Sequence, residues 1–282
     1  MLSNRIKAAL FFGLLALVFT SQINFILAET KNDSTFGITS FSFASYLGTG
    51  FYSTSGQEVF VFQMPFKHTI KEETDQQAGW RLNLPVTIGF INFSKLEIEE
   101  LPQLDDVGTI TFLPGIEYRK KITSNWTLIP FADYGFARDL NHSNNVLIIG
   151  AGIKSYADFD VSCAVITLGN RLLYARESNE KVEVNSDYTL VETGLNFRLD
   201  HKADIFGQDI QLNLYYVNYY YPDDLVFFDR TTSPIRVGVE NELGFTFSNI
   251  PDFMFFSNLH LGFGVRAGND LRVYRLLFSA PF

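Results

Sequence analysis

The sequence is poor in cysteine and in positive charge. A single Cys among 282 residues excludes a disulfide scaffold. Lys and Arg number 22 against 31 Asp and Glu, and the net charge of −9 argues against a nucleic-acid partner, which needs a basic surface. Aromatic residues are abundant instead, at 16%, and this content excludes an intrinsically disordered chain.

The only long apolar run lies near the N-terminus. Arg5 and Lys7 precede apolar residues 8–19, a pattern typical of a secretory signal peptide with cleavage after Ala28. An uncleaved N-terminal anchor is the alternative. No later stretch has the ~18 consecutive apolar residues that a transmembrane helix needs. We therefore expect residues 1–28 to be a signal peptide, 29–56 a first strand or a lumen plug, and 57–282 the main domain.

Apolar residues recur at every second position in much of the chain, as in 80–90, 235–247 and 259–265. The positions between them hold Gly, Thr, Asn and charged side chains. This period predicts strands with one apolar and one polar face. Two classes fit the pattern: a soluble sandwich, or a membrane barrel with its apolar face toward lipid.

The number and length of the strands favour the barrel. Membrane-crossing strands need ~9–11 residues, against ~5–6 in soluble sheets, and bacterial barrels have an even strand count. Long connections at 92–106, 176–186 and 220–234 fall at one end, which places both termini at the periplasmic end. About twelve strands are predicted, at 40–52, 57–70, 78–91, 107–119, 125–138, 145–156, 160–175, 187–200, 208–219, 235–248, 256–267 and 270–282.

The C-terminal segment alternates and ends in Phe. Tyr274, Leu276, Phe278 and Phe282 share one face, a pattern similar to the signal that the bacterial outer-membrane assembly machinery reads. Aromatic residues at predicted strand ends fit interfacial girdles: Trp126, Tyr134, Tyr215, Tyr216, Tyr219 and Tyr220. The fold class we expect is all-β, a transmembrane antiparallel up-and-down barrel in the bacterial outer membrane.

Two adjacent segments point to a family. The stretch 106–118, a turn, and the W-x-L-x-P-x-x-x-x-G pattern of 126–135 resemble the solitary outer-membrane autotransporter β-barrel domain, as do Gly150, Gly152 and Phe282. The resemblance implies a twelve-stranded barrel of the translocator type. Few residues separate Ala28 from the first predicted strand, so passenger export is not carried over.

Charged side chains on the predicted polar faces are the candidate functional residues. Membrane-embedded charges must face water or one another, since Arg or Lys against lipid at the midplane costs ~2–4 kcal/mol. They would form either a transverse field that filters solutes or Arg–Glu pairs that fill the lumen, and we favour the pairs. The candidates are Arg81, Glu117, Arg119, Asp133, Lys154, Arg171, Glu192, Arg198, Arg236, Glu240, Glu242, Arg266 and Arg275.

No motif predicts catalysis or cofactor binding. His142 lies in a polar segment without a nucleophile or a second acid at a recognisable spacing, and no metal-ligand spacing occurs. We expect no enzyme, no metal and no cofactor. The expected partners are outer-membrane lipid, lipopolysaccharide and the assembly machinery. The predicted role is structural or that of a weak pore; the alternatives are a small-solute channel and a surface-binding barrel that acts through the loops 92–106, 176–186 and 220–234.

Overall fold

The computed structural model describes most of the chain after residue 34. The described ranges are 35–36, 41–54, 57–91, 107–140, 144–162, 164–179, 185–205, 208–228, 234–250, 259–268 and 271–282. The predicted signal peptide, His142 and Cys163 lie outside them. Residues 33–282 form one compact unit, the subject of the following description. No described helix has the length and apolar content needed to cross a bilayer.

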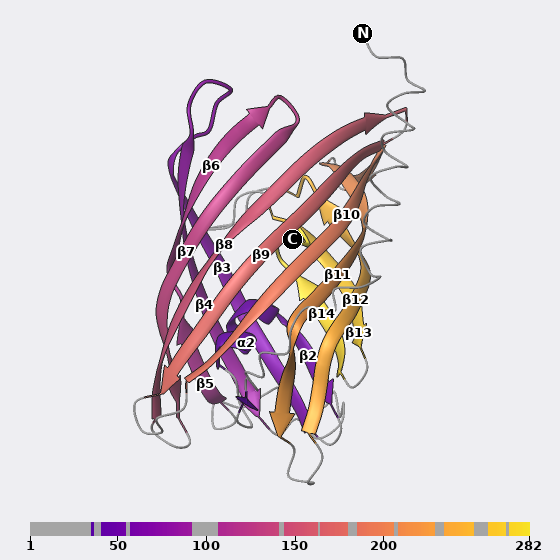
Figure 1. Cartoon of the computed structure of the whole chain (residues 1–282). Helices are drawn as coiled ribbons and strands as arrows, with labels where there is room; N and C mark the ends of the chain where they lie inside the picture. The colour runs from indigo at the N-terminus through magenta and orange to yellow at the C-terminus, as the bar shows by residue number, and fades with distance from the viewer. Residues whose placement is uncertain are drawn as a thin grey trace. The chain divides into compact units, whose positions relative to one another are not determined.

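Nearly all described residues belong to strands (Figure 1). The one helix among the described residues is α2 (Phe41–Leu47). The strands are β1 (Thr35–Phe36), β2 (Gly50–Thr54), β3 (Gln57–Lys71), β4 (Gly79–Ile91), β5 (Val107–Phe112), β6 (Gly115–Thr123), β7 (Trp126–Asp139), β8 (Asn144–Val161), β9 (Ala164–Asn179), β10 (Asn185–Ile205), β11 (Gln208–Phe228), β12 (Pro234–Ser248), β13 (Leu261–Gly268) and β14 (Leu271–Leu277).

The strands form a closed antiparallel barrel. From β2 onward the strands pair in sequence order, apart from β5 and β6, and the β14–β2 pairing closes the ring. β5 and β6 share one position between β4 and β7, interrupted at Leu113 and Pro114, where proline supplies no N–H. β1 is an addition to β11, so the wall has 12 strands. The predicted all-β, up-and-down antiparallel barrel of about twelve strands is confirmed.

The two faces of the wall follow the sequence alternation. On β13, Leu261, Phe263 and Val265 are about 40% exposed on the outer face, at 39, 37 and 42%. Arg266, which follows Val265, is 2% exposed and faces inward. The outer surface is therefore apolar and the inner surface polar, as expected for a membrane barrel.

The barrel has two distinct ends. We call the end with the connections 92–106 and 229–233 the helix end, and the end with the connections 124–125 and 206–207 the tail end. β14 finishes at the tail end, but β1 pairs with Val226 and Phe227 of β11, close to the helix end. Residues 35–36 therefore lie at the helix end, but the N-terminus itself lies outside the described residues, so the placement of both termini at one end stays a prediction.

The first predicted strand, 40–52, is wrong in its first half. Residues 41–47 form α2, and only 50–54 form β2. Between them Gly48 has φ of +84°, a left-handed conformation that glycine adopts without a Cβ penalty. Phe43 and Leu47 lie four residues apart and are both buried, so one face of this short helix packs on the lumen wall.

Two predicted outer loops are largely strand. β9 and β10 reduce the connection 176–186 to 180–184, and β11 and β12 reduce 220–234 to 229–233. Pro222, Asp223 and Asp224, which resemble a turn in sequence, lie in a register shift between Tyr220 and Leu225. The strand continues through this bulge. The connection 249–260 at the tail end is longer than either of these two connections. The prediction that the long connections all lie at one end therefore does not hold.

The last predicted strand ends early. Leu277 pairs with Gly262, near the start of β13, and β2 begins opposite Arg275, so residues beyond Leu277 have no strand pairing in the described wall. Residues 278–282, here called the tail, leave the barrel wall. Of the predicted assembly signal, Tyr274 and Leu276 lie on the outer face, and Phe278 packs against Phe62. Phe282 instead lies in the lumen, so the four residues do not share one face.

Candidate functional site

The lumen is the candidate site, because almost all predicted charged residues point into it. Arg236 is the correction: it is exposed, and its neighbour Val237 is 1% exposed and faces inward. The register shift on β11 pairs Leu225 with Val237 and Tyr220 with Val239, which changes the inward parity before Glu240. The inward residues are Arg81, Glu117, Arg119, Asp133, Lys154, Arg171, Glu192, Arg198, Glu240, Glu242, Arg266 and Arg275.

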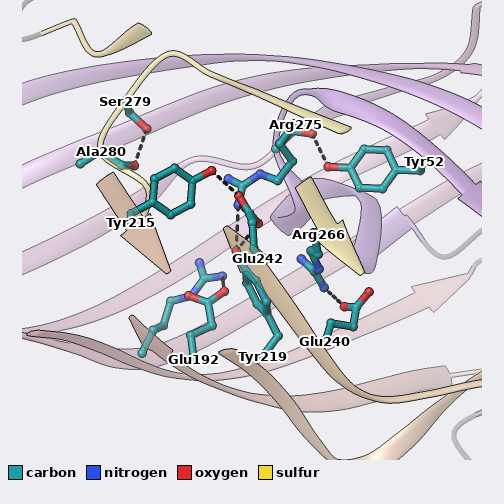
Figure 2. A network of polar contacts seen from close by, with 12 residues as sticks. Tyr52, Glu192, Tyr215, Tyr219, Glu240, Glu242, Arg266, Arg275, Ser279 and Ala280 are labelled. Carbon is teal, nitrogen blue, oxygen red and sulfur yellow. Dashed lines mark hydrogen bonds and ion pairs between the residues drawn. The ribbon is translucent and has the colours of Figure 1, made fainter. Parts of the chain in front are cut away.

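Glu242 is the centre of the largest polar network (Figure 2). Its carboxylate is fully buried and accepts hydrogen bonds from Tyr215 Oη at 2.7 Å and Tyr219 Oη at 2.8 Å. Arg275 Nη1 donates to the same carboxylate at 2.8 Å and to Tyr219 Oη at 2.8 Å. Burying a charge is tolerable only with such pairing and hydrogen bonding, so these four side chains form one interdependent unit.

Arg266 forms a second buried pair beside the first. It bonds Glu240, donates to Tyr221 Oη at 2.8 Å, and lies 3.8 Å from the ring centroid of Tyr219. The aromatic face of Tyr219 stabilises the guanidinium of Arg266 by a cation–π interaction. Arg266 is 2% exposed and Glu240 0%, so both charges lie in the packed interior of the barrel.

The other side of the lumen carries further ion pairs. Lys154 Nζ lies 2.7 Å from Glu117 and 5.0 Å from the ring centroid of Phe131. Arg171 pairs with Glu192 on the neighbouring strand. Arg119 pairs with Glu73, which follows β3 at the tail end. Opposite charges therefore pair within the wall rather than forming two separate ladders.

α2 lies inside the barrel and binds the wall by polar contacts. The backbone N–H of Ser42 donates to Glu177 Oε2 at 2.7 Å, and Tyr46 Oη donates to Asp133 Oδ2 at 2.8 Å. From the wall, Gln63 Nε2 donates to the carbonyl oxygen of Ser45 at 2.8 Å. These contacts reach β9, β7 and β3, so they connect α2 to separate parts of the ring.

Aromatic packing completes the filling at the helix end. The Phe43 ring lies 6.1 Å from the ring of Tyr188 and 6.1 Å from that of Tyr221, centroid to centroid. These rings belong to a buried cluster with Tyr52 and Leu225. The helix end of the lumen is therefore packed like a protein core.

Phe282 fills the lumen nearer the tail end. Its ring stacks on Tyr156 at 6.2 Å between centroids, with 23° between the planes. A Cβ added to Gly169 would clash with Cδ2 and Cε2 of Phe282, and a Cβ at Gly194 would lie 2.6 Å from Cδ1 and Cε1. The two glycines therefore form the niche that admits the ring.

The buried tyrosines are the site residues that the sequence analysis missed. The sequence predicts Tyr215 and Tyr219 in an interfacial girdle, but they are 1% and 3% exposed and face Glu242. The structure shows why they fit inside: Tyr215 pairs with Gly244, where a Cβ would lie 2.6 Å from its hydroxyl, and Gly264 approaches the same hydroxyl. This register is not visible in the sequence. Trp126, Tyr134 and Tyr220 are exposed, as a girdle requires.

Within the described ranges, no group of three or more His, Cys, Asp or Glu side chains is placed to hold a metal ion. No protein-family model matches the chain, and no curated protein matches it. Among solved structures, the chain is similar to the β domain of the Bordetella autotransporter BrkA. The identity is 10% and the TM-score 0.46, over 80% of this chain and 92% of that one.

Proposed function

We propose that this chain is an outer-membrane β-barrel of the autotransporter-like type that acts as a closed, structural membrane barrel. The apolar outer face, the polar lumen and the signal-like N-terminus support the membrane location. Lipid and lipopolysaccharide are then its surroundings, and the outer-membrane assembly machinery inserts it. The family resemblance of residues 106–135 supports the same class.

The closed state is supported mainly by the contacts that hold α2 against the lumen wall. A weakly held plug would leave its polar groups to water, whereas Ser42 and Tyr46 bond buried or partly buried carboxylates. Bonds to charged acceptors contribute about 1.5–3 kcal/mol each, more than bonds between neutral groups. Together with the packing of Phe43, they favour a plug that stays in place.

Planar-bilayer conductance tests this proposal. The protein starting at residue 29 should give no steady conductance, because α2 occupies the lumen. A version lacking residues 29–50 should conduct. Since this deletion also removes Gly50 from β2, the double variant Phe43→Ala, Tyr46→Ala provides a test with the strands intact, and we expect brief openings from it.

Ile149→Ala is the matched control, since Ile149 is 46% exposed on the outer face of the same barrel. It should stay closed. Steady conductance of the unaltered protein would overturn the closed barrel and support the solute-channel alternative, with the lumen charges as its filter. A closed double variant that is folded by circular dichroism would show that α2 is not the plug.

A further inference from the structure

Basic side chains outnumber their acidic partners where β3, β4, β6 and β8 approach the tail end. Glu73 pairs with Arg119, and Asp75 Oδ1 lies 2.8 Å from the ammonium of Lys121. Within the described ranges, five cations face three carboxylates in this part of the barrel. The cations are Lys67, Arg81, Arg119, Lys121 and Lys154, and the carboxylates are Glu73, Asp75 and Glu117.

Arg81 has an acidic residue opposite it but no ion pair with it. The strand register places Arg81 opposite Glu117. Glu117 Oε1 instead lies 2.7 Å from Lys154 Nζ, and Oε2 lies 3.7 Å from Arg119 Nη1. Among the side chains that the structure describes, Arg81 and Lys67 therefore form no ion pair.

These two cations are neighbours on one inner face. Lys67 pairs with Asn83 and Thr69 with Arg81 in the ladder between β3 and β4. Gln63, on the same face of β3, bonds α2, which places this face in the lumen. Lys67 and Arg81 are therefore diagonal neighbours, a spacing that long side chains can bridge, and their charges act on each other.

The donor groups at this position can be reached from the tail end. Lys67 is exposed, and Thr69 and Arg81 are half-buried. Thr69 and Arg81 each lie two residues from the strand end that borders the connection 72–78. Within the described part of the chain, the Lys67 ammonium, the Thr69 hydroxyl and the Arg81 guanidinium donate no hydrogen bond to another side chain. A ligand can therefore use all three groups without breaking a contact of the wall.

We infer that Lys67, Thr69 and Arg81 bind a phosphate group carried by a water-soluble phosphomonoester. The planar guanidinium of Arg81 matches two phosphate oxygens, the Lys67 ammonium supplies a second positive charge, and the Thr69 hydroxyl is a further donor. Two like charges without a counter-charge repel each other, and a phosphate of nearly two negative charges relieves this repulsion better than a carboxylate of one. The three side chains face inward, away from lipid, and this favours a soluble phosphate compound over a lipid headgroup.

The site is independent of the closed-barrel proposal, because binding at the tail end requires no passage through the lumen. Isothermal titration of the refolded protein starting at residue 29, in a maltoside detergent without phosphate, tests it. Glycerol 3-phosphate is the probe, with acetate as a singly charged anion and glycerol as a neutral compound. We expect one site with a Kd of about 1 mM or tighter for glycerol 3-phosphate, and binding weaker by about ten-fold for acetate.

A short-chain lipid distinguishes the source of the phosphate. Dihexanoyl phosphatidate carries the same group on a lipid, and we expect it to bind no more tightly than glycerol 3-phosphate. Binding of the phosphatidate alone would overturn the assignment to a soluble phosphomonoester.

Variants then locate the site. Lys67→Gln and Arg81→Gln should each weaken the binding of glycerol 3-phosphate about ten-fold, and Thr69→Val should weaken it several-fold. Lys71→Gln is the matched control and should bind normally, because Lys71 is exposed on the same strand and pairs with Trp80 of the outer face. Circular dichroism confirms the fold of each variant. Absence of binding, equal binding of acetate, or full affinity in Lys67→Gln and Arg81→Gln would overturn the inference.

Discussion

Phe282 stacks on Tyr156 across the lumen, although β14 and β8 are not neighbours in the wall. The contact joins the end of the chain to a strand far around the ring. Gly169 and Gly194 admit the ring of Phe282, and β14 ends at Leu277, which frees the tail to turn inward. Several measurable consequences depend on this contact and on the network around Glu242.

Phe282→Ala should lower the free energy of unfolding by about 2 kcal/mol. This is less than the ~3–5 kcal/mol of a fully buried Phe, because Phe282 is only partly buried. Urea unfolding in phospholipid vesicles measures the change. Phe278→Ala, which alters a contact with Phe62 alone among the described ring pairs, is the control. An equal or larger loss of stability in the control would contradict the packing of the Phe282 ring in the lumen.

The same residue should matter during assembly in cells. If Tyr274, Leu276, Phe278 and Phe282 form the signal for the assembly machinery, deletion of Phe282 lowers the amount of folded protein in the outer membrane. Heat-modifiable mobility on gels measures that amount. Refolding of the variant that lacks Phe282 into detergent micelles separates its role in stability from its role in recognition, since the assembly machinery is absent there. Normal membrane levels of the deletion variant would contradict the signal.

Glu242→Gln should destabilise the barrel by about 3–5 kcal/mol, because it leaves the charge of Arg275 buried without a partner. Tyr215→Phe removes one hydrogen bond from the same carboxylate and should cost less, about 1.5–3 kcal/mol. Asp187→Asn at the exposed contact with Tyr174 provides a control near zero. Urea unfolding of the three variants gives the order; similar losses in all three would show that the network contributes little.

Phe263→Arg should prevent normal insertion, because an arginine on the lipid face costs ~2–4 kcal/mol at the midplane. Phe263→Leu keeps the surface apolar and should insert normally. The fraction of protein folded after dilution into liposomes distinguishes them. Equal insertion of both variants would mean that Phe263 does not face lipid.

Acidification should destabilise the protein through His260. Its pKa is lowered below 6.5 in the folded state, mainly by burial and then by Lys67 and Arg198. The unfolded chain therefore takes up a proton first, so stability falls as the pH drops below about 6.5. His260→Asn should reduce this fall between pH 7 and 5 in urea unfolding, and an unchanged slope would show that His260 does not contribute.

The regular parts of the barrel are predictable from the sequence, because a period of two shows directly in β4, β12 and β13. The errors occur where a tertiary contact overrides local pattern. Residues 41–47 have strand-like composition, but the enclosed lumen stabilises a helix there. Phe282 continues the apolar alternation of β14 in sequence, but no strand pairs with the chain beyond Leu277 in the described wall, so the strand ends there. Arg236 changes face because of a bulge on β11, the neighbouring strand, which no periodicity within β12 can reveal.

The candidate site was predictable by residue type but not by partner. Inward charges follow from the alternation, so Glu242, Arg266 and Arg275 are expected in the lumen. Their pairing depends on strand register and on Tyr215 and Tyr219, whose aromatic character suits the membrane interface equally well.

The brevity of β2 sets where the ring is mechanically weakest. β2 has 5 residues, whereas β10 and β11 have 21 each, so the junction between β14 and β3 is joined by far fewer ladder bonds than the opposite side. Phe278 lies against Phe62 beside this short junction. A pulling force, or thinning of the surrounding bilayer, should therefore separate the wall first between β2 and β14, while the long strands opposite remain paired.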